Sequence, residues 1–155
     1  MIDSLSKGRV FTSMDIKAGF HNIPLTQKAR AATVFITQDG VYCWNVMPFG
    51  LKGAPAHFQR ALQLTIQTPD DLSVVVYIDD SVIMGQTWRE TWTKILEAIK
   101  KLSKAGFMLN IAKCHFLSDK ISIVGMEVVG GEYNAKPSKI QALFTSKIPS
   151  SIREL

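Results

Sequence analysis

Residues 74–84 read Val-Val-Val-Tyr-Ile-Asp-Asp-Ser-Val-Ile-Met, two apolar runs separated by adjacent carboxylates. Apolar, β-branched runs predict buried strands, so the simplest geometry is a tight hairpin with Asp79 and Asp80 at its tip. Adjacent carboxylates repel each other unless a cation lies nearby, and hard divalent cations such as Mg²⁺ take oxygen ligands. An Asp-Asp pair can equally be a polar turn between strands. The dipeptide alone leaves both interpretations open.

The composition indicates one globular domain. The chain has 155 residues, of which 46% are hydrophobic and 20% charged, which is typical of a domain with a packed core. The formal net charge of +5 is compatible with a polyanionic partner. We interpret four of the positive charges as the solvated face of one helix. These charges belong to Lys94, Lys100, Lys101 and Lys104.

The cysteines and the hydropathy pattern bear on the compartment. Cys43 and Cys114 are far apart and form no metal-ligand pattern, so we expect reduced, packing thiols of an intracellular protein. The expected location is therefore inside the cell. No stretch is long and apolar enough to span a membrane, and the first residues carry no signal-peptide pattern. We therefore expect no membrane partner.

The order of predicted elements favours an α+β fold. Strands are expected at residues 10–16, 32–37, 41–47, 73–85, 108–111 and 121–129. Helices are expected at residues 55–67, between Thr87 and Gly106, and from Pro137 to about Phe144. This order predicts an antiparallel sheet with two main helices packed on one face. Residues 1–155 are expected to form a single domain, in which residues 134–155 are a peripheral C-terminal segment.

The helix after residue 86 has the clearest signals. Thr87 and Glu90 fit a capping box, with Thr87 as the cap and Glu90 reaching back. The expected apolar stripe comprises Trp92, Ile95, Leu96, Ile99 and Leu102.

A third carboxylate can join the Asp79-Asp80 pair. Asp15 lies near the end of the first expected strand, in which apolar and polar positions alternate. Ends of strands in one sheet can converge on one rim, so the three carboxylates can lie together. Three carboxylates at one rim of a small antiparallel sheet suggest a two-metal phosphoryl-transfer centre.

Four motifs, in order, resemble those of reverse transcriptases. They are Phe11-Thr-Ser-Met-Asp15-Ile-Lys-Ala-Gly-Phe20-His, Val46-Met-Pro-Phe49-Gly-Leu-Lys-Gly-Ala-Pro55-Ala-His-Phe-Gln-Arg60, Tyr77-Ile-Asp-Asp80 and Gly106-Phe-Met-Leu-Asn110-Ile-Ala-Lys113-Cys. The pattern is closest to gypsy-class LTR retrotransposons and covers essentially the whole chain. The resemblance implies a polymerase palm with a ferredoxin-like core. It also implies RNA-directed DNA polymerase activity on an RNA or DNA template and primer, with deoxynucleoside triphosphates.

The resemblance also implies the metal site. Asp15 and Asp79 would hold two Mg²⁺ ions, which Mn²⁺ could replace. Asp80 would be a weaker or indirect ligand, and the carbonyl of Ile16 would complete one site. Lys113 matches a general acid for pyrophosphate departure, and its alternative is a solvated loop lysine.

Further roles follow from the same resemblance. Phe20 lies where the family has an aromatic gate against the ribose 2′-hydroxyl, although a core position is the alternative. Phe49 matches a position that touches the nucleotide sugar. The remaining matches are Gly19 and Ile78 in nucleotide binding and Val124 and Gly125 in the primer grip.

The chain also departs from the family pattern. The family's fingers strands, thumb and RNase H are expected to lie outside this sequence. At the primer grip this sequence has Ile123-Val124-Gly125 where relatives have Phe-Leu-Gly. Residues 28–33 match the family pattern less closely than is usual. The alternatives are therefore a polymerase fragment, a relic, or a domesticated palm that binds nucleic acid or protein without turnover. A nucleotide cyclase, which shares the palm topology, ranks below these because it has no place for Met47-Pro-Phe-Gly-Leu51.

Overall fold

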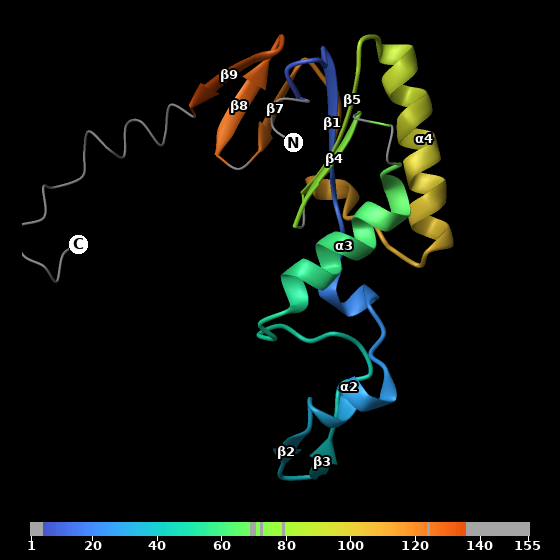
Figure 1. The fold of residues 1–155 in the computed structure, drawn as a ribbon, viewed down its shortest axis with the longest axis vertical. Coiled ribbons are helices and arrows are strands. Elements are labelled where there is room, and N and C mark those ends of the chain that lie inside the picture. The colour runs from blue at the N-terminus through green and yellow to red at the C-terminus, as the bar shows by residue number, and fades with distance from the viewer. Residues whose placement is uncertain (1–4, 69–70, 72, 79, 124, 136–155) are drawn as a thin grey trace, which may run out of the picture.

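The computed structural model describes residues 5–68, 71, 73–78, 80–123 and 125–135. Its centre is a four-stranded antiparallel sheet in the order β4-β5-β1-β6. The strands are β1 (Val10–Asp15), β4 (Val74–Tyr77), β5 (Asp80–Gly85) and β6 (His115–Ser118). Two helices, α3 (Ala54–Ile66) and α4 (Trp88–Lys104), cover one face of this sheet (Figure 1). The predicted α+β layout, with both main helices on one face, is confirmed.

The helix-covered face of the sheet contains the main core. Alternate residues of β1 point toward the helices, and Thr12 and Met14 are buried there. They meet one side of α3 and one side of α4. The core side chains from these two helices are Phe58, Leu62, Ile66, Ile95, Ala98 and Leu102. This packing explains why the apolar residues of α3 recur every four positions.

A second, smaller sheet covers part of the opposite face. Its strands are β7 (Lys120–Ile123), β8 (Met126–Val129) and β9 (Glu132–Ala135), paired antiparallel in that order. A second apolar cluster fills the space between the two sheets. It contains Leu5, Phe11, Val75, Val82, Met84, Ile121, Ile123 and Val128. Residues 74–76 of β4 and 82–84 of β5 are buried on both faces here, which explains why these two stretches are continuously apolar.

Several predicted boundaries were wrong. Residues 121–129 are two strands because Gly125 (φ 76°) turns the chain between β7 and β8. Residues 108–111 contribute one isolated bridge to Ile16, from Leu109. The strand that pairs with β1 on the side away from β5 is β6. The strand β9 was not predicted. Residues 136–155, with the helix expected from Pro137, lie outside the described residues.

The segment between β1 and α3 also differs from the prediction. A short helix α2 (Gln27–Ala31) begins after Thr26, whose hydroxyl accepts the Ala29 N–H. The predicted strands shrink to β2 (Phe35–Thr37) and β3 (Gly40–Tyr42), which form a separate hairpin away from the main sheet (Figure 1). Cys43, expected to be packed, is exposed, and both cysteines are free thiols. No described helix is long and apolar enough to cross a membrane.

The capping box of α4 is confirmed. The Glu90 N–H donates to Thr87 Oγ1 at 3.2 Å, and the Gln86 N–H donates to Glu90 Oε2 at 2.9 Å. A hydrogen bond from Lys94 (2.6 Å) and the Gln86 N–H hold the pKa of Glu90 below its usual range. Lys94 therefore pairs within the helix, whereas the last three lysines of α4 are exposed as predicted.

The apolar stripe of α4 was predicted too wide. The buried residues are Thr91, Ile95, Ala98 and Leu102, and Ile99 is partly buried against the core. Trp92 and Leu96 are 48% and 41% exposed. The reason is that the sheet contacts only a narrow strip of the helix, which the spacing of apolar residues did not reveal.

Replacing Thr87 with alanine tests the cap of α4. Loss of the hydroxyl acceptor should lower the free energy of unfolding by about 1 kcal/mol. Thr93 is a matched control, since its hydroxyl bonds only to the Arg89 carbonyl within the helix. Thr93→Ala should be neutral or slightly stabilising, because alanine has the better helix propensity. Urea unfolding measures both, and equal effects of the two variants would contradict the capping role.

Candidate active site

Asp15 and Asp80 are cross-strand neighbours. Asp15 ends β1, Asp80 begins β5, and the antiparallel register places the two residues directly opposite each other. Directly opposed residues share one face of the sheet, with Cβ atoms about 5 Å apart. Like charges in this position are destabilising, and a cation between the carboxylates converts the repulsion into attraction. The fold thus brings together two of the three predicted carboxylates. Asp79 lies outside the described residues.

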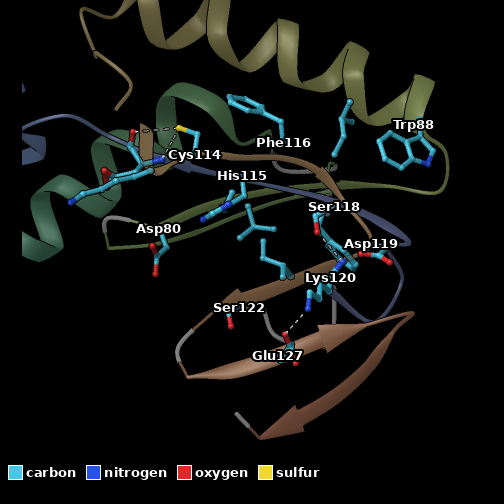
Figure 2. A pocket seen from close by; sticks show the side chains of 17 residues that line it. Asp80, Trp88, Cys114, His115, Phe116, Ser118, Asp119, Lys120, Ser122 and Glu127 are labelled. Atoms are coloured by element: carbon cyan, nitrogen blue, oxygen red, sulfur yellow. Dashed lines mark hydrogen bonds and ion pairs between the residues drawn. The ribbon is translucent and has the colours of Figure 1, made fainter. Parts of the chain in front are cut away.

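Both carboxylates line a cavity of about 1060 Å³ between the two sheets. The small sheet covers only one end of this face, so the end with Asp15 and Asp80 stays open. Figure 2 shows Asp80 and Cys114 at one end of the cavity and Trp88 at the other. The lining is mixed in charge, and Lys120 Nζ lies 3.8 Å from Glu127 Oε1. Lys113, the predicted general acid, is exposed and lines the same cavity.

The end of β1 is held by the segment that precedes β6. Asn110 N–H donates to the Asp15 carbonyl at 2.9 Å, and Lys17 N–H donates to the Met108 carbonyl at 2.7 Å. The Asp15 N–H donates to Cys114 Sγ at 3.4 Å. Ile16, the predicted carbonyl ligand, is buried and forms the bridge to Leu109. These bonds fix the peptide groups that carry Asp15.

The turn before Asp80 is strained. Ile78 has φ +51°, a left-handed conformation that costs energy for a β-branched residue. Its N–H donates to Gln59 Oε1 of α3 at 3.4 Å. Sequence reasoning missed Gln59 as a contact of this turn. The available signal was a polar residue directly after the buried Phe58, at the point where α3 faces the sheet.

Phe20 packs between a buried ring of the core and an exposed ring at the surface. It lies in the short 3₁₀ helix η1 (Gly19–Asn22), half-buried, with its ring 5.4 Å from that of Phe58 and 5.3 Å from that of Phe49. Phe49 is 66% exposed. Neither Phe20 nor Phe49 lines the carboxylate cavity. The core therefore anchors the Phe20 ring while part of the ring stays accessible. This geometry is compatible both with a core position and with a gate against the ribose 2′-hydroxyl.

Gly19 permits the close packing of η1 on α3. A Cβ atom at Gly19 would lie 2.8 Å from the tip of the Phe58 ring. The glycine thus has a packing function, whatever its role in nucleotide binding. The predicted primer grip falls on the β7–β8 turn, where Gly125 is half-buried and Val124 lies outside the described residues. The flanking residues Ser122 and Glu127 line the cavity.

The donor set is compatible with a hard divalent cation. Asp15 and Asp80 offer carboxylate oxygens on one face of the sheet, next to open space. Oxygen donors of this kind are what Mg²⁺ and Mn²⁺ prefer. Among the described residues no group of three or more histidine, cysteine, aspartate or glutamate side chains is placed to hold a metal. The described pair therefore supplies two of the donors that such a centre requires.

Comparisons with known proteins identify the family. Residues 1–128 match the family described as reverse transcriptase (RNA-dependent DNA polymerase). The chain is 33% identical over 98% of its length to the retrovirus-related Pol polyprotein from transposon opus of Drosophila melanogaster, and 31% identical to that from transposon 297. It spans 15% of the length of each. The Genome polyprotein of Petunia vein clearing virus is 32% identical, and the chain spans 7% of it.

Solved structures agree on the fold. A foamy viral protease-reverse transcriptase in complex with double-stranded DNA gives a TM-score of 0.85 at 19% identity, covering 96% of this chain and 26% of that one. The same kind of protein in complex with an RNA/DNA hybrid gives 0.81 at 21% identity, over 99% of this chain and 21% of that one. The fold and the expected family, that of gypsy-class LTR retrotransposon enzymes, are confirmed. The chain belongs to the reverse transcriptase (RNA-dependent DNA polymerase) family.

Proposed function

We propose that this chain is the palm of an RNA-directed DNA polymerase and carries a two-metal nucleotidyl-transfer site. The observation that supports this proposal best is the cross-strand pair of Asp15 and Asp80 beside an open cavity. Like charges directly opposite each other are destabilising, and a cation held by both carboxylates would offset that cost. Asp79 directly precedes Asp80 in the sequence. In this proposal it joins Asp15 and Asp80 as the third carboxylate of the site.

In this proposal some residues bind metal and another acts as general acid. Asp15 and Asp79 would hold two Mg²⁺ ions, Asp80 would be a weaker or indirect ligand, and the Ile16 carbonyl would complete one of the two sites. Bound Mg²⁺ would lower the pKa of the primer 3′-hydroxyl and offset the charge of the triphosphate. The hydroxyl loses its proton to water, its oxygen bonds to the α-phosphorus, the bond to the bridging oxygen breaks, and pyrophosphate leaves. Lys113, in the same cavity, gives a proton to that leaving group.

In this proposal the nucleotide and the primer contact different sets of residues. The incoming deoxynucleotide contacts Gly19, Phe20, Phe49 and Ile78. The primer end contacts Val124 and Gly125. The template and primer are RNA or DNA. The foamy viral neighbours, whose structures contain double-stranded DNA or an RNA/DNA hybrid, support a duplex partner.

The rest of the polymerase is supplied by other segments of one polyprotein. The chain spans only 15% of the Drosophila polyproteins that it matches. Fingers, thumb and RNase H segments would complete the hand around this palm. Such a protein acts inside the cell, in the cytoplasm, the nucleus or a virus-like particle.

Primer extension tests the polymerase proposal. The purified chain, joined to its flanking polyprotein segments, should add deoxynucleotides to a primer in the presence of Mg²⁺. Asp15→Asn should reduce the rate at least about a hundredfold, because metal catalysis contributes several kcal/mol. Asp119→Asn is the matched control, since Asp119 is an exposed carboxylate of the same cavity. A fully active Asp15→Asn enzyme, or no extension by the completed protein, would refute the proposal.

Metal binding can be measured on the 155-residue chain itself. Mn²⁺ at about a hundredfold excess over its Kd should stabilise the fold by about 2.7 kcal/mol, or roughly 5–10 °C in melting temperature. Asp15→Asn should abolish this rise, and Asp119→Asn should keep it. Without metal, Asp15→Asn should melt at the same temperature or slightly higher, because the repulsion with Asp80 is removed. Equal Mn²⁺ shifts in the wild type and Asp15→Asn would contradict the site.

Phe20→Val tests the gate against ribonucleotides in the completed polymerase. The ring leaves no room for a 2′-hydroxyl, so its loss should relax sugar selectivity by at least about tenfold. The measurement is the ratio of kcat/KM for dNTP and rNTP. Phe116→Val, which removes an exposed ring from the carboxylate cavity, should leave the ratio unchanged. An active Phe20→Val enzyme with an unchanged ratio would make Phe20 a core residue only.

A further inference from the structure

Cys114 contacts the peptide groups that carry Asp15. It follows the 3₁₀ helix η2 (Ile111–Lys113) and precedes β6. Its Sγ accepts the Asp15 N–H at 3.4 Å and lies 3.3 Å from the Asn110 carbonyl oxygen, which the thiol can donate to. Cys114 is half-buried and lines the cavity that Asp15 also lines (Figure 2). The sequence alone indicated only a packing thiol.

The thiol replaces a missing strand partner. The pairing of β1 with β6 ends at Ser13 and His115. Beyond that point the Asp15 carbonyl accepts the Asn110 N–H at 2.9 Å, and the Asp15 N–H donates to the sulfur. A backbone N–H that is half-buried and without an acceptor costs stability and lets the strand end shift. The side chain of Cys114 therefore continues the ladder up to the carboxylate residue.

We propose that Cys114 is a positioning residue for Asp15, an inference that rests on the proposed metal site. By accepting the Asp15 N–H, the sulfur keeps the end of β1 in register with β5, so that the Asp15 carboxylate stays opposite Asp80. The function depends on the acceptor at position 114 rather than on the volume that the side chain fills. Groups that orient metal ligands commonly affect metal affinity about 10–100-fold.

Two substitutions distinguish a role of Cys114 as hydrogen-bond acceptor from a role in packing. Cys114→Val keeps the volume and removes the acceptor, and the extended backbone at this position (φ −77°, ψ 142°) suits a β-branched residue. Cys114→Ser keeps an acceptor and loses volume. If Cys114 acts as an acceptor, Cys114→Val should weaken Mn²⁺ binding more than Cys114→Ser does. If Cys114 acts by packing, Cys114→Ser should weaken it more. Cys43→Ser, at the exposed cysteine, is the control.

The readouts are the Kd for Mn²⁺ by calorimetry and the amide exchange rate of Asp15 by NMR, both on the 155-residue chain. We expect Cys114→Val to raise the Kd about tenfold and to speed the exchange, with a fall of only a few degrees in melting temperature. Cys114→Ser should change the Kd less than Val does, and Cys43→Ser should change neither quantity.

Three results would overturn the inference. One is a Cys114→Val chain that binds Mn²⁺ like the wild type. Another is a larger loss of affinity in Cys114→Ser than in Cys114→Val, which would show a packing role. The third is a wild type without Asp15-dependent Mn²⁺ binding, which refutes the proposed metal site and this inference with it. In that case a normal Asp15 exchange rate in Cys114→Val would also exclude the hydrogen bond.

Discussion

The antiparallel pairing of β1 with β5 is the constraint on which the rest of this structure depends. It runs from Val10 opposite Gly85 to Asp15 opposite Asp80, and it places β1 at the centre of the sheet. Side chains alternate between the faces of a strand, so a slip of one residue would exchange the core face and the carboxylate face together. The register that buries Met14 against the helices is therefore the register that opposes the two carboxylates. Core packing and candidate chemistry are fixed by one set of hydrogen bonds.

The sequence carried enough information for three strands of the main sheet, β1, β4 and β5, and for both long helices. Their apolar periodicity comes directly from the faces that they bury, as the recurrence of Phe58 and Leu62 in α3 shows. The short elements were harder to predict, because they are determined by contacts distant in sequence. For example, β6 begins after the turn that Cys114 closes against Asp15. The wide stripe predicted for α4 failed for the same reason, since Trp92 finds no partner surface on the sheet.

The sequence predicted which residue types form the candidate site, but it predicted their arrangement in space only in part. The spacing of Asp15 and Asp80 from the ends of their strands indicated that they converge, and the register bears this out. The sequence could not show which backbone and side-chain groups support the carboxylates. The contact of Gln59 with the strained Ile78 joins a helix to a turn, and no periodic pattern reports such a contact. Asp79 remains a prediction.

The central position of β1 also has a consequence for the order of folding. This first strand of the chain pairs with β5 and β6, both of which are made much later during synthesis. On the ribosome β1 must therefore wait, with the apolar side chains of Phe11 and Met14 uncovered, until α3 and the hairpin have emerged. Folds dominated by such distant pairings fold slowly and expose aggregation-prone strands meanwhile. The pair of Asp15 and Asp80 thus cannot form until β5 has been made, after more than half of the chain.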